Sequence, residues 1–184
     1  MKDAILVMFP EIDLIQSPSL RESVLNTYED ALLSGGWLPE DMNLIPFTLD
    51  FPEFIFSYAD HVHGVTAVSR QAAESFNATY QANEHYRVDM DTVIAGALLH
   101  DVGKLVEYER TGNGQYSKTA YGKLIRHPAS GAIIAARNGC PASICHIIAT
   151  HAAEGDVQER TPEAIIINKA DFINFDIINY LRKH

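Results

Sequence analysis

Apolar residues recur at three- and four-residue intervals along most of the chain, which is the spacing of one face of a helix. The first stripe covers residues 18–35, opened by Ser17-Pro18 and closed by Gly35-Gly36. A longer stripe follows Pro52, which can open a helix, and Asp91 can cap a third segment, residues 92–100, that is apolar on nearly all sides. These patterns predict two amphipathic helices and a central helix that the others cover.

The second half of the chain continues the helical pattern. Helices are predicted from His127-Pro128 to Asn138-Gly139, from Pro141 to His151 and from Thr161 to about Arg182. Residues 111–114 (Thr-Gly-Asn-Gly) predict a turn or a small hairpin, and residues 37–50, which contain two prolines, predict an irregular connection. The predicted fold class is all-α.

Composition adds few constraints to this picture. A chain of 184 residues with 47% hydrophobic and 21% charged residues fits one globular domain. The longest apolar stretches, such as Val93–Leu99, are too short to span a membrane, and the first ten residues lack the features of a signal peptide. The two cysteines, Cys140 and Cys145, have no zinc-knuckle spacing, so we expect buried thiols and a cytoplasmic protein. The oligomeric state is not specified.

We expect one domain over residues 1–184, with residues 1–50 as an N-terminal helical extension and residues 51–184 as the core. The extension is too short to bury a good core of its own. Its apolar stripe, which includes Val24, Tyr28 and Leu32, must nevertheless be covered. The segment should therefore pack on the core and form part of the wall of a pocket.

The net charge of −10 argues against nucleic acid as the main partner, because binding to phosphate backbones depends on Lys and Arg. The balance reverses between Val102 and Arg126, where five basic residues oppose two acidic ones for a local charge of +3. This basic segment favours a small anionic substrate, most simply a phosphorylated one.

Histidines and aspartates occur in a regular order along the predicted helices. Both side chains bind catalytic divalent metals, and helices that each contribute one or two ligands can meet at a common point. A carboxylate has two oxygens and can bridge two cations, which could then hold a hydroxide and clamp a phosphoryl group. The ordered candidates are His61, His100, Asp101, His127, His151 and Asp171.

The residues around these candidates resemble a known family. The segment Ala97–Lys104 (ALLHDVGK) resembles the ALLHDIGK motif of the HD-domain metal-dependent phosphohydrolase superfamily. His61, followed four positions later by Val65, is similar to the first-histidine helix of that superfamily. The segments ending at Pro128 and His151 resemble the two extra histidines of its binuclear members, and Lys169–Phe172 resembles the closing aspartate. The resemblance covers about residues 58–175.

The resemblance implies an HD-domain helical bundle with two divalent transition-metal ions. His61, His100, Asp101 and Asp171 would surround one ion, and His127 and His151 would hold the second, with Asp101 bridging. Iron, manganese, cobalt, nickel and zinc all suit such a donor set. Cyclic-dinucleotide phosphodiesterases of the HD-GYP type usually carry a His-His pair, whereas Ala152 follows His151 here, so that activity is disfavoured.

The sequence leaves several alternatives open. His63 competes with His61 as the first ligand, although Val65 fits the motif only with His61. Lys104 is a candidate catalytic cation for a substrate oxyanion, and Lys123 and Arg126 are candidate substrate contacts. The favoured activity is hydrolysis of a phosphate ester of a small metabolite or nucleotide. A di-iron oxygenase of the inositol or phosphonate type is the alternative, and a non-catalytic sensor is a third reading.

Overall fold

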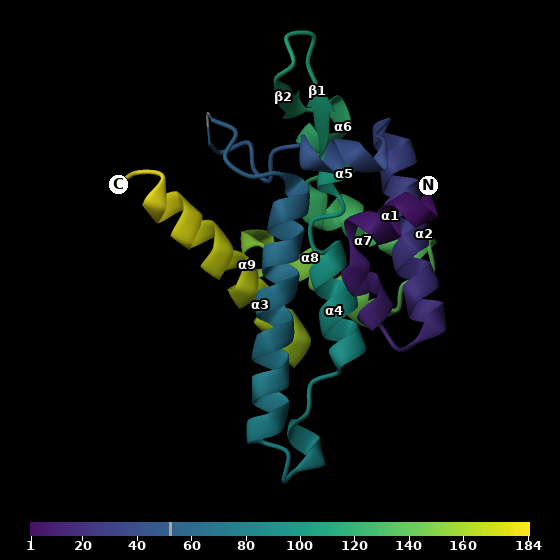
Figure 1. Ribbon diagram of the computed structural model, residues 1–184, viewed down its shortest axis with the longest axis vertical. Coiled ribbons are helices and arrows are strands. Elements are labelled where there is room, and N and C mark those ends of the chain that lie inside the picture. The colour runs from purple at the N-terminus through teal and green to yellow at the C-terminus, as the bar shows by residue number, and fades with distance from the viewer. Residues whose placement is uncertain (52) are drawn as a thin grey trace.

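The computed structural model describes residues 1–51 and 53–184, and it confirms the all-α class (Figure 1). Short 3₁₀ turns and one small antiparallel hairpin accompany the helices. The elements are α1 (Lys2–Met8), η1 (Pro10–Leu14), α2 (Pro18–Gly35), η2 (Pro39–Asn43), α3 (Tyr58–Thr79), η3 (Glu84–Tyr86), α4 (Met90–Leu99), α5 (Lys104–Glu107), β1 (Tyr108–Arg110), β2 (Tyr116–Lys118), α6 (Ala120–Leu124), α7 (His127–Arg137), α8 (Ala142–Thr150), η4 (Ala153–Gly155) and α9 (Pro162–Leu181).

The apolar helix α4 lies at the centre of the bundle, as predicted. Every residue from Val93 to Leu99 is buried, and α4 contacts α2, α3, α8 and α9. Figure 1 shows α3 running away from the hairpin end of the molecule and α4 returning toward it. The N-terminus of α3 and the C-terminus of α4 therefore lie at the same end.

The N-terminal segment packs on this bundle, as its apolar stripe predicted. Its buried residues belong to the same hydrophobic cluster as those of α4. The Tyr28 hydroxyl of α2 donates to the carbonyl of Leu98 in α4, and the Trp37 indole donates to the carbonyl of Leu105 over 2.7 Å. Because both carbonyls flank the His100-Asp101 pair, α2 and the following loop support the end of α4.

The start of α3 differs from the prediction. Pro52, the expected first residue, lies outside the described residues, and the helix begins six positions later at Tyr58. Ser57 and Asp60 form a reciprocal capping box, in which each side chain accepts a hydrogen bond from the other residue's backbone amide. This double cap satisfies two of the free amides and fixes the helix start one turn before His61.

The cap of α4 was also assigned to the wrong residue. Asp89, not Asp91, accepts the capping hydrogen bond, from the Thr92 amide. The Asp91 carboxylate instead accepts hydrogen bonds from the backbone amides of Gln16 and Ser17, at 2.7 and 2.8 Å. This residue therefore fastens the N-terminal segment to α4.

The turn at residues 111–114 does form a hairpin. Strands β1 and β2 pair antiparallel, with Tyr108 opposite Lys118 and Arg110 opposite Tyr116.

Among the described residues, no helix combines the length and the apolar character needed to cross a membrane. Cys140 is buried, Cys145 is partly buried, and both are free thiols.

Candidate metal centre

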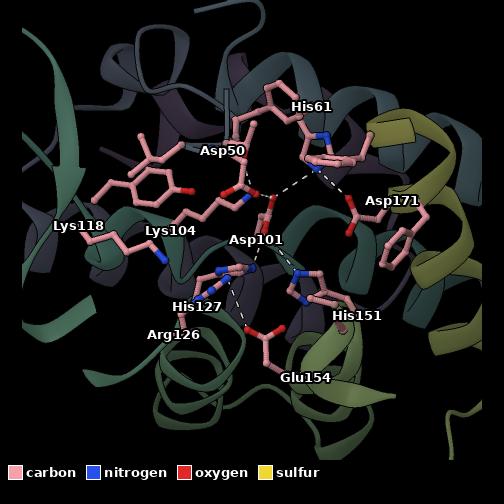
Figure 2. A pocket seen from close by; sticks show the side chains of 18 residues that line it. Asp50, His61, Asp101, Lys104, Lys118, Arg126, His127, His151, Glu154 and Asp171 are labelled. Atoms are coloured by element: carbon pink, nitrogen blue, oxygen red, sulfur yellow. Dashed lines mark hydrogen bonds and ion pairs between the residues drawn. The ribbon is translucent and has the colours of Figure 1, made fainter. Parts of the chain in front are cut away.

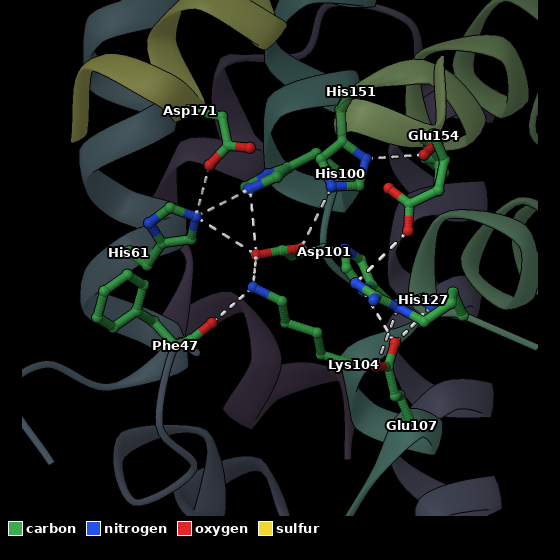
Figure 3. A network of polar contacts seen from close by, with 12 residues as sticks. Phe47, His61, His100, Asp101, Lys104, Glu107, His127, His151, Glu154 and Asp171 are labelled. Carbon is green, nitrogen blue, oxygen red and sulfur yellow. Dashed lines mark hydrogen bonds and ion pairs between the residues drawn. The ribbon is translucent and has the colours of Figure 1, made fainter. Parts of the chain in front are cut away.

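The six predicted histidines and aspartates converge at one end of the bundle (Figure 3). Each comes from a helix or a helix end: His61 from the first turn of α3, Asp171 from the middle of α9, and the others from the termini of α4, α7 and α8. Residues more than 100 positions apart therefore meet, which confirms that helices can bring this ordered series to one point.

Asp101 lies at the centre of the cluster. Its Oδ2 atom is 3.3 Å from His61 Nε2 and 3.4 Å from His100 Nε2. Its Oδ1 atom is 3.3 Å from His127 Nε2 and 3.4 Å from His151 Nε2. The two oxygens of one buried carboxylate thus face two separate pairs of imidazoles.

Asp171 completes the group on the side of Oδ2. Its Oδ1 atom is 3.1 Å from His61 Nε2, and its carboxylate is partly exposed to the pocket. Burial raises the pKa of this carboxyl, but the hydrogen bond with His61 and the neighbouring imidazoles outweigh burial and lower the pKa to about 2. Asp171 is therefore an anion at neutral pH.

The hydrogen-bond partners of the Nδ1 atoms determine which tautomer each of three histidines adopts. The Nδ1 atoms of His100 and His151 lie 2.7 and 2.8 Å from the carbonyls of Ala97 and Ile148. A carbonyl only accepts, so both Nδ1 atoms must carry the proton. The Nδ1 atom of His127 lies 2.9 Å from the carboxylate of Glu107 and is a donor for the same reason.

These tautomers leave an excess of lone pairs at the centre. With Nδ1 protonated, the Nε2 atoms of His100, His127 and His151 are acceptors, and they face the carboxylate oxygens of Asp101, which are also acceptors. The two kinds of acceptor repel each other unless a proton or a cation lies between them. The ligand atoms lie within 4.8 Å of one another in each of two groups, His61-His100-Asp101 and Asp101-His127-His151. Separations near 3.3 Å are those of neighbouring ligands about 2.1 Å from a common ion. The residues present fit a divalent metal.

The structure separates the two candidates for the first ligand. His61 points into the cluster, and its ring packs 5.2 Å from that of His100. His63, two positions further along α3, points to the other side and pairs with Glu11 of η1 at 2.7 Å. The geometry therefore places His61, not His63, among the other five residues.

Lys104 is buried beside the cluster. Its ammonium donates to Asp101 Oδ2 over 2.6 Å and to the carbonyl of Phe47 over 2.5 Å. Burial lowers the pKa of this ammonium, but the charge of Asp101 outweighs burial and raises it above its usual value. Lys104 is thus a fixed cation whose charge is already paired, and the Phe47 carbonyl links it to the loop before α3.

Gly103 explains how the end of α4 reaches α7. A Cβ atom at this position would lie 2.1 Å from the carbonyl oxygen of His127 and 2.7 Å from the amide of Gly131. Because only glycine fits here, the turn after Asp101 packs directly against the first turn of α7. The same contact brings His127 to Asp101.

The cluster forms the floor of a cavity of about 210 Å³ (Figure 2). Residues 47–50 form part of its wall, as expected for the irregular segment before α3. The cavity is lined by Phe47, Thr48, Leu49, Asp50, His61, Asp101, Lys104, Tyr108, Lys118, Arg126, His127, His151, Ala152, Ala153, Glu154, Asp171, Phe172 and Phe175. Lys118 and Arg126 lie on one side of Asp101 in Figure 2, and Asp171 lies on the other.

The basic rim differs in part from the sequence-based expectation. Arg126 lines the cavity as proposed, whereas Lys123 is exposed on α6 and does not line it. Lys118 lines the cavity instead, because strand β2 positions it there. Glu107, which contacts His127, was also not singled out. The pairing of β1 with β2 would have been the signal for Lys118, since it places Lys118 opposite Tyr108, next to Glu107.

Burial and nearby charges separate the pKa values of His127 and Glu107. Burial lowers the pKa of His127 to about 4, although Glu107 and Asp101 act in the opposite direction. Burial also disfavours the Glu107 anion, but hydrogen bonding with His127 and the nearby Lys118 outweigh it and lower the pKa of Glu107 to about 2. At neutral pH His127 is therefore a neutral imidazole next to a carboxylate, which is the state that binds a metal.

An all-α bundle with a His/Asp centre built around an adjacent His-Asp pair defines a class of metal-dependent phosphohydrolases. The sequence model of the HD domain family matches residues 58–174, and the chain belongs to this family. The match begins at the start of α3 and ends in α9, so it spans every residue of the cluster.

The similar curated proteins are bacterial ribonucleases. Ribonuclease Y of Thermotoga petrophila and Ribonuclease Y of Thermotoga maritima are each 29% identical to this chain over 112 residues, which is 61% of this chain and 19% of the relative. The chain thus spans about a fifth of the length of the curated relatives it matches. No solved structure matches it significantly.

Proposed function

We propose that the chain is a metal-dependent phosphohydrolase that holds two divalent transition-metal ions and cleaves a phosphate ester of a small metabolite or nucleotide. The observation that carries the proposal is the division of the cluster by Asp101. His61, His100 and Asp171 gather around one carboxylate oxygen, and His127 and His151 gather around the other. Asp101 is therefore the residue that both ions would share as a ligand.

The second metal position, around Asp101 Oδ1, is suited to a catalytic role. Three protein side chains could supply its ligands, namely His127, His151 and Asp101, and all three line the cavity. Catalytic sites keep positions free for water and substrate, whereas structural sites are closed by protein ligands. When bound, the divalent ions supply Lewis acidity to a phosphoryl group.

The side chains of the cavity support a phosphorylated substrate. Lys118 and Arg126 form a cationic rim beside the second position, and their side chains are 32% and 49% exposed. Lys104 also lines the cavity, with its charge paired to Asp101. Phe172 and Phe175 of α9 provide an apolar wall. We infer that the phosphate lies toward Lys118 and Arg126 and that the rest of the molecule contacts the aromatic side.

The size of the cavity favours a small substrate over a long chain. A volume of about 210 Å³ accommodates a phosphoryl group with a small attached moiety. The overall charge of −10 also disfavours a polyanion. The name of the Ribonuclease Y relatives makes the phosphodiester bond of RNA the competing substrate, and the experiment must therefore include it.

The test compares small phosphate esters with RNA under the same conditions. Protein reconstituted with Mn²⁺ or Co²⁺ is assayed for release of inorganic phosphate from mononucleotides and sugar phosphates, and for cleavage of single-stranded RNA. We expect phosphate release that EDTA abolishes and that is absent in Asp101→Asn. Cleavage of RNA without action on any monophosphate would overturn the proposed substrate class. Oxygen consumption with an iron-loaded protein, without hydrolysis, would overturn the reaction class.

A further inference from the structure

Glu107 lies beside His127, at one side of the cluster (Figure 3). Its Oε2 atom accepts two hydrogen bonds from His127, from the backbone amide at 2.5 Å and from Nδ1 at 2.9 Å. Its Oε1 atom is 2.9 Å from Lys118 Nζ and 3.4 Å from Arg126 Nε. One buried carboxylate thus contacts a candidate metal ligand with one oxygen and both rim cations with the other.

The local structure holds this carboxylate in place. Glu107 is the last residue of α5, and its backbone carbonyl accepts a hydrogen bond from the Thr119 amide. Gly122 of α6 packs against it so closely that a Cβ atom there would lie 2.5 Å from the Glu107 carbonyl oxygen and 2.8 Å from its Cγ. The side chain is only 1% exposed. Its orientation is therefore set by α5, the hairpin and α6 together.

His127 differs from the other imidazoles of the cluster. His100 and His151 place Nδ1 against neutral backbone carbonyls, and His61 Nδ1 has no hydrogen-bond partner among the described residues. Only His127, within the described part of the cluster, has an anionic partner for Nδ1. A carboxylate in this position fixes the ring and its tautomer and makes the opposite nitrogen a stronger ligand.

Glu107 Oε1 forms ion pairs with both rim cations. Lys118 Nζ lies 2.9 Å away and Arg126 Nε 3.4 Å away, and within the described residues neither contact has the angles of a hydrogen bond. Arg126 is also shared with Glu154, at 3.5 Å. Both cations line the cavity and are partly exposed, so an anion in the cavity can contact them while they still face Glu107.

We propose that Glu107 is a positioning residue that couples anion binding at Lys118 and Arg126 to metal binding at His127. An anion at the rim shares the two cations, which then neutralise less of the Glu107 charge, so that this charge acts more strongly on His127 and favours a cation at its Nε2. By reciprocity, a metal at His127 strengthens anion binding by the same factor. The inference rests on the two-ion assignment of the proposed function, but its test does not require turnover.

The experiment measures Mn²⁺ binding to the metal-free protein with and without inorganic phosphate. We expect phosphate to tighten the weaker of the two sites in the wild-type chain. Glu107→Gln should weaken that site roughly 10–100-fold, the usual effect of removing such an outer partner, and should reduce the phosphate effect. Lys118→Gln should lose most of the phosphate effect and, because it removes a cation from Glu107 permanently, should bind Mn²⁺ without phosphate at least as tightly as the wild type. Glu109→Gln is the matched control, because Glu109 is exposed on the same hairpin.

The possible failures are distinguishable. Wild-type affinity for both ions in Glu107→Gln would overturn the role of Glu107, and an unchanged phosphate effect in Lys118→Gln would overturn the coupling. A wild-type chain that binds one ion would overturn both the two-ion assignment and the coupling. Failure of the proposed activity would instead appear as an absence of hydrolysis with metal binding intact.

A second measurement covers the case in which Glu107→Gln does not fold. Nitrogen-15 NMR of the metal-free wild-type protein reports the tautomer of each imidazole, and the His127→Gln variant identifies the resonance of His127. We expect the Nδ1–H tautomer with a proton protected from exchange, because Glu107 accepts it. The Nε2–H tautomer, or a rapidly exchanging Nδ1 proton, would overturn the positioning role.

Discussion

Lys104 provides the positive charge nearest to Asp101. Its ammonium contacts Asp101 Oδ2 and the Phe47 carbonyl, and both contacts are buried. The sequence alone does not distinguish this lysine from a solvent-exposed lysine that contacts a substrate. The structure shows that its charge also neutralises the buried Asp101 carboxylate, so we expect its replacement to affect stability.

We predict that Lys104→Met destabilises the metal-free protein by about 3 kcal/mol, because Asp101 is left as a buried charge without its ammonium partner. Metal supplies a replacement charge, so the difference from wild type should shrink with saturating Mn²⁺. Urea unfolding in EDTA and in Mn²⁺ measures both quantities. Lys123→Met, at an exposed position, is the control. Equal stability in EDTA, or a difference that Mn²⁺ leaves unchanged, would contradict this account.

The metal-ligand candidates were predictable at the residue scale, whereas the residues that support them were not. His100 and Asp101 are adjacent, and each remaining candidate has characteristic neighbours in the sequence. Glu107 and Lys118 have no such neighbours. They act because the hairpin and α6 fold over the start of α7, and that placement depends on tertiary contacts.

Among the secondary-structure elements, the sequence predicted which segments are helical, but it predicted less well the residues at which the helices begin. Asp89 and Asp91 both precede the same apolar run, and either can cap a helix. The choice depends on Gln16 and Ser17, whose amides donate to the Asp91 carboxylate from 75 and 74 residues away, respectively. The start of α3 was predicted at a proline, but the reciprocal cap of Ser57 and Asp60 determines it.

An ion-pair cluster joins α2 to α7. The Asp30 carboxylate accepts hydrogen bonds from Arg137 at 2.7 Å and from Asn138 at 2.6 Å. Burial raises the pKa of Asp30, but the hydrogen bonds from Asn138 and Arg137 outweigh it, so the pKa lies below its usual value of 3.8. The charged form of Asp30 therefore stabilises the contact between the two helices.

The sign of the pH dependence follows from this lowered pKa. The contribution of Asp30 is fully present above pH 3.8 and is lost as the pH falls through the lowered value. We predict that Asp30→Asn costs about 1 kcal/mol at neutral pH, as expected for a partly exposed pair, and that the difference from wild type narrows below about pH 4. Urea unfolding across this pH range measures it, with exposed Asp176→Asn as the control. A difference that is constant with pH would contradict the assignment.

At the scale of the whole molecule, the N-terminal segment completes the site. Its apolar side chains share a cluster with α4, and residues 47–50 line the cavity. The HD domain match begins only at residue 58, so this wall lies outside the matched region. The sequence predicted that the segment packs on the core because its stripe needs cover. We propose that this segment helps to determine which substrate fits the cavity.

We propose that one carboxylate, that of Asp101, is shared by two cations. Metal content per folded chain, measured by mass spectrometry after loading with Mn²⁺ and removal of free ions, tests whether it is. We predict about two ions in the wild type and in His63→Ala, about one in His127→Ala, and nearly none in Asp101→Ala, because loss of the shared ligand opens both positions. Retention of both ions by Asp101→Ala, or loss of an ion from His63→Ala, would contradict the account.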